Sequence, residues 1–285
     1  MTSNEPTAQT GIIDAHQHFW RYNVTQHSWI NDEMAIIRKD FLPANLQPIL
    51  EASKVAGCVA VQADQTKAET IFLLDLSAQY SFIKGVVGWI DLRADDIQQQ
   101  LEAYLSYKKL CGFRHVLQSE APSFMLDPLF VRGLKLLPKY NFTYDILIYP
   151  HHLPAAIELV KQLPAVRFVV DHLAKPYISK GVLEDWKTNI TTLAQYPNVC
   201  CKVSGMVTEA DMRNWKATDF KPYIDAVVDA FGTGRLMFGS DWPVCLAAAS
   251  YPDMLQIVKD YFSSFSAAEQ QQVFSTNATD FYHLI

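Results

Sequence analysis

Residues 11–18 read Gly-Ile-Ile-Asp-Ala-His-Gln-His, a short apolar run that ends in a His-x-His pair. Side chains alternate between the two faces of a β-strand, so we expect Asp14, His16 and His18 to point in the same direction. Two imidazoles on one face can bind a metal ion, or together polarise an oxygen atom of a substrate. A pair of surface histidines has the same spacing, so the rest of the chain must decide between these interpretations.

Short apolar runs recur along the chain and alternate with longer amphipathic stretches. Eight runs have the β-branched and aromatic residues typical of strands buried on both faces of a parallel sheet, namely residues 12–16, 58–62, 83–90, 112–117, 142–148, 167–171, 199–203 and 236–239. Helical patterns occupy residues 46–56, 68–80, 97–108, 128–139, 154–162, 183–196 and 223–231. This alternation predicts an α/β protein with one closed (β/α)8 TIM barrel.

Length and composition fit a single enzyme domain. The chain has 285 residues, of which 49% are hydrophobic and 19% charged, and no linker or low-complexity tract divides it. Residues 1–10 are polar and predict a disordered tail, whereas residues 11–285 predict one barrel domain with closing helices after Pro252.

Charge and hydropathy exclude several classes of partner. The net charge is -6 and basic residues form no cluster, which argues against a nucleic-acid partner. No apolar run approaches the ~18 residues of a membrane span, and the first ten residues lack the apolar core of a secretory signal. The five cysteines have no metal-site spacing. We therefore expect a cytoplasmic protein that acts on a small molecule, and a homo-oligomer remains one alternative.

Polar residues end five of the eight predicted strands. The active site of such a barrel lies at the carboxyl ends of the strands, so these residues are the candidates. They are His16 and His18 on the first run, Arg114 and His115 on the fourth, His151 and His152 after the fifth, Asp171 and His172 on the sixth, and Ser240 and Asp241 on the eighth. Their convergence on one mouth predicts an active site.

Four segments carry a family resemblance. Asp-Ala-His-Gln-His-Phe-Trp at 14–20, Gly-Phe-Arg-His at 112–115, Asp-His-Leu-Ala-Lys-Pro at 171–176 and Gly-Ser-Asp-Trp-Pro-Val at 239–244 resemble the amidohydrolase superfamily. More narrowly, they resemble its branch of sugar-lactone hydrolases, to which the pyrone-dicarboxylate hydrolases are related. The resemblance implies a TIM barrel of the amidohydrolase type and the hydrolysis of a lactone.

Lactone hydrolysis needs a polarised carbonyl, a deprotonated water and a stabilised oxyanion. Asp241 is the candidate general base. His16, His18 and His172 either hold a metal ion that acidifies the water or donate hydrogen bonds to the carbonyl oxygen.

The fourth strand bears on the number of metals. Superfamily members with two metals use a bridging Lys or Glu there, where this chain has Arg114 and His115. The resemblance therefore implies either one divalent metal such as zinc, held by some of His16, His18, His172 and Asp241, or catalysis without a metal.

Several residues near the predicted mouth are candidates for substrate binding: Arg114, His115, Trp29, Gln118, Trp242 and His152. Strand alternation places only one of Arg114 and His115 at the mouth, with the other bracing a loop. Carboxylated lactones from aromatic breakdown need guanidinium partners, and the mouth offers one clear arginine. We therefore favour a neutral sugar-acid lactone over a dicarboxylate.

Two other functions compete with lactone hydrolysis. One is a metal-dependent non-oxidative decarboxylase of the same superfamily, against which the segment at 171–176 argues. The other is a binding barrel without activity, against which the intact set of histidines and Asp241 argues.

Overall fold

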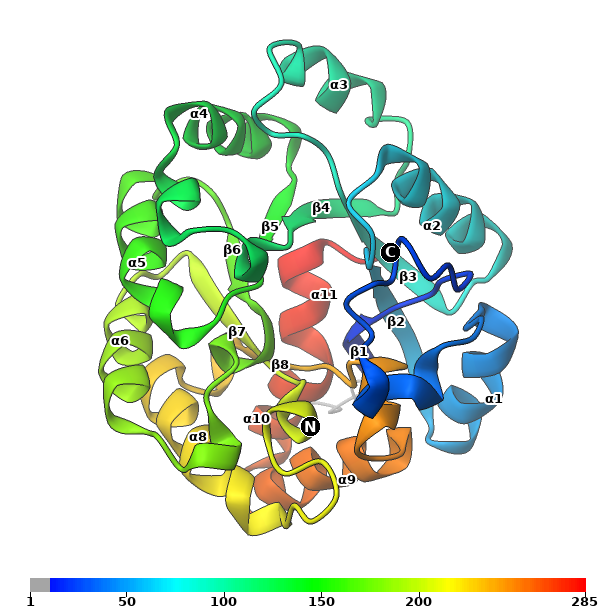
Figure 1. Ribbon diagram of the computed structural model, residues 1–285, viewed down its shortest axis with the longest axis vertical. Coiled ribbons are helices and arrows are strands. Elements are labelled where there is room, and N and C mark those ends of the chain that lie inside the picture. The colour runs from blue at the N-terminus through cyan, green and yellow to red at the C-terminus, as the bar shows by residue number, and fades with distance from the viewer. Residues whose placement is uncertain (1–10) are drawn as a thin grey trace, which may run out of the picture.

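The computed structural model describes residues 11–285 as a barrel of parallel strands surrounded by helices (Figure 1). Around the sheet, in sequence order, lie β1 (Ile12–Gln17), β2 (Val55–Val61), β3 (Ile83–Gly88), β4 (Leu110–His115), β5 (Thr143–Ile146), β6 (Phe168–Val170), β7 (Val199–Val203) and β8 (Leu236–Phe238). Each of the eight predicted strands overlaps one of these, so the predicted TIM barrel is confirmed. The predicted tail, residues 1–10, lies outside the described residues.

The barrel closes between the ends of β8 and β1. The Asp241 amide donates to the His16 carbonyl at 2.8 Å, and the His18 amide donates to the Trp242 carbonyl at 2.7 Å. This closure brings Asp241 beside the His-x-His pair, although the two segments are far apart in the sequence.

Helices follow the strands, and most of them cover the outside of the barrel, whereas the last one, α11, lies over the middle of the ring of strands (Figure 1). The helices are α1 (Pro43–Ala52), α2 (Lys67–Gln79), α3 (Ile97–Ala103), α4 (Pro128–Leu136), α5 (Leu153–Gln162), α6 (Glu184–Ala194), α7 (Met206–Glu209), α8 (Ala217–Phe231), α9 (Tyr251–Phe262), α10 (Ala267–Gln271) and α11 (Asn277–Tyr282). Helix α1 ends at Ala52, earlier than the predicted end at residue 56. The reason is that Lys54 adopts a left-handed φ of 57° and β2 already begins at Val55. Among residues 11–285, no helix combines the length and the apolar character needed to cross a membrane.

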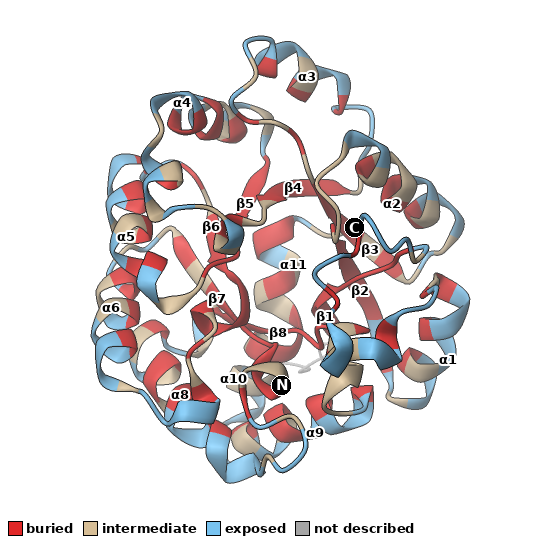
Figure 2. Cartoon of the chain, viewed as in Figure 1, coloured by how far each residue is buried: buried red, intermediate tan, exposed pale blue. Residues whose placement is uncertain are grey.

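Two layers of apolar side chains hold the barrel together. Buried residues occupy the strands and parts of the surrounding helices (Figure 2). The larger layer fills the space between strands and helices. The smaller one lies inside the barrel, where Val59, Val87 and Met237 pack with Phe281 and Tyr282 of α11. Because apolar side chains occupy this part of the interior, the buried polar groups gather toward the carboxyl ends of the strands.

A bulge on β1 changes where its polar side chains point. Asp14 pairs with Cys58 and Gln17 with Ala60, so the step along β1 is one residue longer than the step along β2. Asp14 instead accepts hydrogen bonds from the Ser240 amide at 2.9 Å and hydroxyl at 2.6 Å. The expectation that Asp14 points with His16 and His18 is therefore wrong, because the extra residue breaks strict alternation.

Candidate active site

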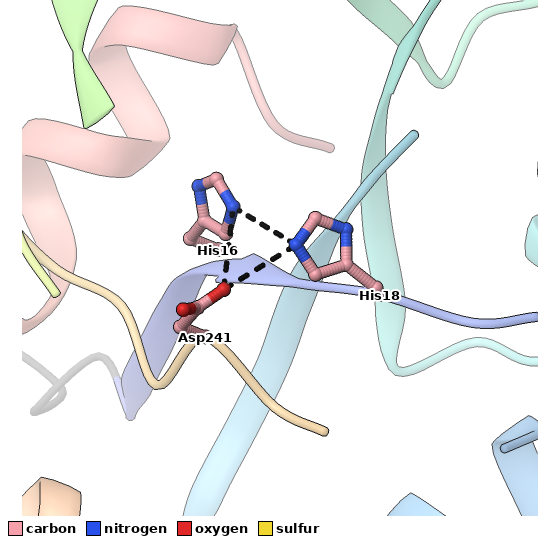
Figure 3. A group of neighbouring side chains, drawn as sticks. All are labelled: His16, His18 and Asp241. Atoms are coloured by element: carbon pink, nitrogen blue, oxygen red, sulfur yellow. Dashed lines mark hydrogen bonds and ion pairs between the residues drawn. The ribbon is translucent and has the colours of Figure 1, made fainter. Parts of the chain in front are cut away.

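His16, His18 and Asp241 form a tight cluster at the carboxyl end of the barrel (Figure 3). The Nε2 atoms of His16 and His18 lie 3.2 Å apart. Asp241 Oδ1 lies 3.4 Å from His18 Nε2 and 3.9 Å from His16 Nε2. His18 Nδ1 lies 2.8 Å from the Val61 carbonyl, which fixes the orientation of that ring. The two imidazole rings and the carboxylate thus converge on one point.

His172 completes the cluster from the segment after β6. Its Nε2 lies 3.9 Å from Asp241 Oδ1, and its Nδ1 lies 2.8 Å from the Ser204 hydroxyl. The backbone from His172 to Lys175 is left-handed, with φ between 50° and 58°, a strained conformation for residues that are not glycine. A Cβ at Gly205 would lie 2.5 Å from His172 Nδ1, so glycine is needed there for the imidazole to fit.

Beneath the cluster lies a second set of charged side chains that is fully or almost fully buried. Lys202 Nζ lies 2.6 Å from Asp145 Oδ2, 2.9 Å from Asp171 Oδ1 and 3.0 Å from His16 Nδ1. Arg114 donates to the other oxygen of Asp171 at 3.0 Å. The Tyr282 hydroxyl, from α11, donates to Asp145 at 2.8 Å. Two cations and two carboxylates therefore balance one another inside the barrel.

Burial and neighbouring charges shift the pKa values of these groups. Burial lowers the pKa of His16 well below its usual value, and lowers the pKa of His172 to about 4. Burial alone would raise the pKa of Asp241, but the adjacent histidines outweigh it and hold that pKa below its usual range. Asp171 is likewise held low, against burial, chiefly by Lys202. At neutral pH the cluster therefore contains an ionised Asp241 beside neutral His16 and His172.

A cavity of about 630 Å³ opens above the cluster. His18, His172 and Asp241 line it, whereas His16 is completely buried behind them. The loops that follow several strands supply the remaining walls. The space suits a small-molecule ligand.

Comparison with known proteins identifies the family. Residues 13–284 match the amidohydrolase family. The chain belongs to that family. This amidohydrolase is 40% identical over 284 residues to an L-fucono-1,5-lactonase from Burkholderia multivorans, covering 95% of this chain and 96% of the relative. A second L-fucono-1,5-lactonase, from Burkholderia ambifaria, is 36% identical over 277 residues, with 95% of each chain covered.

Solved structures agree with this assignment. An amidohydrolase from Burkholderia multivorans with bound zinc superimposes with a TM-score of 0.93 at 40% identity, covering 96% of this chain and 99% of the other. A probable 2-pyrone-4,6-dicarboxylic acid hydrolase from Acinetobacter baumannii gives a TM-score of 0.78 at 17% identity, covering 96% of this chain and 100% of the other. At that identity, the second likeness shows the shared fold alone.

The structure of this amidohydrolase brings some of the predicted substrate-binding residues to the cavity. Arg114, Gln118 and Trp29 line it. Trp29 is 42% exposed, which leaves its ring available to a ligand.

Three other predicted substrate-binding residues lie outside the cavity lining. His115 accepts from the Trp89 indole at 3.2 Å and contacts Glu120 at 3.0 Å, so it braces the loop after β4. His152 is buried, with Nε2 3.0 Å from the Glu120 carbonyl. Trp242 is buried against Phe19 and Phe41. Their partners are protein groups, which explains why the rings point away from the cavity.

Sequence reasoning missed two members of the buried set beneath the cluster, Lys202 and Asp145, and part of the cavity wall, including Glu209. Lys202 and Asp145 lie inside the predicted strands at 199–203 and 142–148. A lone charge within an apolar run was the available signal, because such a residue needs a buried partner. Lys175 and Glu209 line the cavity as an ion pair of 2.9 Å.

Two groups of described residues have a composition and spacing suited to a metal ion: His16, His18 and Asp241, and His16, Asp171 and His172. In each group the ligand atoms lie within 4.8 Å of one another. The first group has the nitrogen and carboxylate donors that zinc prefers, and it borders the cavity. In the second group, Lys202 already contacts both His16 and Asp171.

Proposed function

We propose that this amidohydrolase hydrolyses the ester bond of a neutral sugar-acid lactone, with an L-fucono-lactone as the first candidate. The observation that carries the proposal is the ionised Asp241 at the floor of the cavity, surrounded by His16, His18 and His172. The near full-length similarity to two L-fucono-1,5-lactonases supports the substrate class.

The proposed reaction uses Asp241 as the general base. Its carboxylate accepts a proton from a water molecule while the water oxygen attacks the lactone carbonyl carbon. When the ring C–O bond breaks, Asp241 returns the proton to the departing alkoxide. A carboxylate held ionised by its neighbours is ready to act at neutral pH, but it is a weak base, so the carbonyl must be strongly polarised.

Polarisation of the carbonyl comes from the cations and imidazoles around Asp241. His172 lines the cavity and is oriented through Ser204. Arg114 also lines the cavity, and its position is fixed by Asp171. We assign these two residues to the carbonyl oxygen, where the negative charge of the tetrahedral intermediate develops.

A single divalent metal fits the same cluster. His16, His18 and Asp241 would hold it, and a metal bound there lowers the pKa of a coordinated water. We propose at most one such ion per chain, because Lys202 contacts two members of the other candidate group.

The charges of the cavity favour a neutral substrate. Among the described residues that line the cavity, the arginine and lysine side chains are Arg114 and Lys175. Arg114 is already paired with Asp171, and Lys175 is paired with Glu209. A dicarboxylated lactone would find no unpaired cation among these lining residues, and it would approach ionised Asp241. Hydroxyl groups of a sugar can instead bond to both members of the Lys175–Glu209 pair.

A hydrolysis screen with a pH indicator tests the function. Neutral sugar lactones, L-fucono-1,5-lactone among them, are compared with carboxylated pyrones and muconolactones. We expect proton release with a higher kcat/KM for a neutral lactone. A carboxylated lactone that exceeds every neutral one would overturn the substrate class, and a protein that hydrolyses no lactone would overturn the function.

A further inference from the structure

The backbone directly after β6 forms a left-handed turn. His172, Leu173, Ala174 and Lys175 have φ angles of 53°, 55°, 58° and 50°, and none of them is glycine. In this region the Cβ atom of an ordinary residue crowds its own backbone, so such residues occur there singly rather than in runs. Four in a row persist only where the surrounding structure holds them, and strain of this kind clusters at functional sites.

The turn brings two functional side chains to the cavity together. It is closed by the Lys175 amide, which donates to the His172 carbonyl at 2.7 Å. Side chains three residues apart in so tight a turn lie on the same side, and His172 and Lys175 both line the cavity. Leu173 and Ala174, between them, are completely buried. On a regular strand, residues three apart would instead face opposite sides of the sheet.

The turn is held both at its side chains and at its backbone. The two side chains that reach the cavity are held by the contacts with Ser204 and Glu209 described above. The backbone between them is held by Trp186, whose indole N–H donates to the Leu173 carbonyl at 2.7 Å. The direction of a carbonyl follows from the backbone dihedral angles, and a buried carbonyl without a partner is unfavourable. This hydrogen bond therefore favours the left-handed conformation of Leu173.

Trp186 itself is not among the residues that line the cavity. It lies on α6, is 2% exposed, and packs edge-on against Tyr223 of α8 with ring centroids 5.4 Å apart. Two helices therefore fix the position of the indole donor. Any effect of this residue on a bound substrate must pass through the turn.

We propose that Trp186 is a positioning residue: its N–H holds the Leu173 carbonyl, and the left-handed turn then presents His172 and Lys175 together to the substrate. One indole in the outer layer of the barrel thus sets the place of the imidazole assigned to the lactone carbonyl and of the ammonium available to a sugar hydroxyl. The inference rests on the proposed function only in taking the cavity as the site of hydrolysis.

Removing the indole N–H while keeping an aromatic ring tests the proposal. Trp186→Phe removes the donor, and benzothienylalanine incorporated at residue 186 keeps the whole ring system with sulfur in place of the N–H. We expect either change to lower kcat/KM on the best lactone about tenfold, through both a lower kcat and a higher KM, because His172 and Lys175 are displaced together. Trp215→Phe is the matched control, since its indole makes the same kind of bond, to the Ala248 carbonyl at 2.8 Å. It should leave kcat/KM within about twofold of the wild type.

A rescue separates the turn from a general loss of packing. Glycine adopts a left-handed φ without the crowding of a Cβ atom, so Ala174→Gly should restore most of kcat/KM when it is added to Trp186→Phe. Ala174→Gly alone should stay close to the wild type. A loss that glycine does not recover would show that Trp186 affects activity through the packing of α6, and it would overturn the proposal.

Crystal structures of the variants give a measurement that uses no lactone. With the N–H removed, we expect residues 172–175 to leave the left-handed region and His172 Nε2 to lie farther from Asp241 Oδ1 than the 3.9 Å of the wild type. An unchanged turn in the benzothienylalanine protein would refute the role of Trp186. A displaced turn in a protein whose wild type hydrolyses no lactone would support the positioning role and overturn the proposed function alone.

Discussion

The carboxyl end of the barrel carries two layers of polar side chains that differ in what can reach them. His18, His172 and Asp241 line the cavity, so a substrate can touch them. Lys202 and Asp145, one layer deeper, are 0% exposed. The upper layer can therefore take part in bond making, whereas the lower layer acts by fixing charge and orientation. We expect substitutions in the lower layer to reduce the stability of the protein, and substitutions in the upper layer to reduce kcat.

The largest expected effect is a loss of protein stability when the lower layer is changed. Lys202→Met leaves Asp145 and Asp171 without the cation between them, and breaking a buried ion pair in this way costs roughly 3–5 kcal/mol. Urea unfolding should show this loss, and adding Asp145→Asn should recover part of it because one uncompensated charge is removed. A Lys202→Met protein as stable as the wild type would mean that the lower layer is not a coupled charge network.

The next effect is on turnover in the upper layer. Asp241→Asn cannot take a proton from water, so kcat on the best lactone should fall by roughly 10²-fold or more while the melting temperature changes little. Asp64→Asn is the matched control, since Asp64 lines the same cavity and its carboxylate contacts Gln26 and not His16, His18 or His172. Near-normal kcat in the Asp241 variant would remove this residue as the base.

The two layers also differ in how well the sequence predicts them. His16, His18, His172 and Asp241 end apolar runs, and because parallel strands end at one face of a barrel, their spatial convergence could be predicted. Strand alternation also indicated that Arg114 and His115 could not both face the mouth, and the structure places Arg114 in the cavity lining and His115 against the loop.

The lower layer could not be assembled from the sequence in the same way. Lys202 and Asp145 are separated by 57 residues, and each is a single charge inside an otherwise strand-like run. Their pairing depends on the register between strands and on which residues face inward. The bulge at β1 shows how one extra residue alters that facing, and nothing in residues 12–17 marks its position.

A smaller effect is expected at the wall of the cavity, where Glu209 neutralises Lys175. Glu209→Gln frees the ammonium, so the ratio of kcat/KM for a carboxylated lactone to that for a neutral one should rise about tenfold, as one charge-assisted hydrogen bond of ~1.5 kcal/mol allows. Lys175→Met is the counterpart and should lower the same ratio. If both variants move the ratio in the same direction, the pair acts through packing rather than charge.

The smallest effect is expected from removing metal. Lys202 and Arg114 already place two cations next to His16. We therefore expect exhaustive chelation to change kcat by less than about twofold. Elemental analysis of the purified protein should give no more than one equivalent of divalent metal per chain, since Lys202 contacts His16 and Asp171 in the second candidate group. Addition of zinc to the chelated enzyme is the control, because an essential ion would restore lost activity at one equivalent. Activity that disappears with the chelator and returns with zinc would show that the upper layer depends on a metal and that the charge of the lower layer does not replace it.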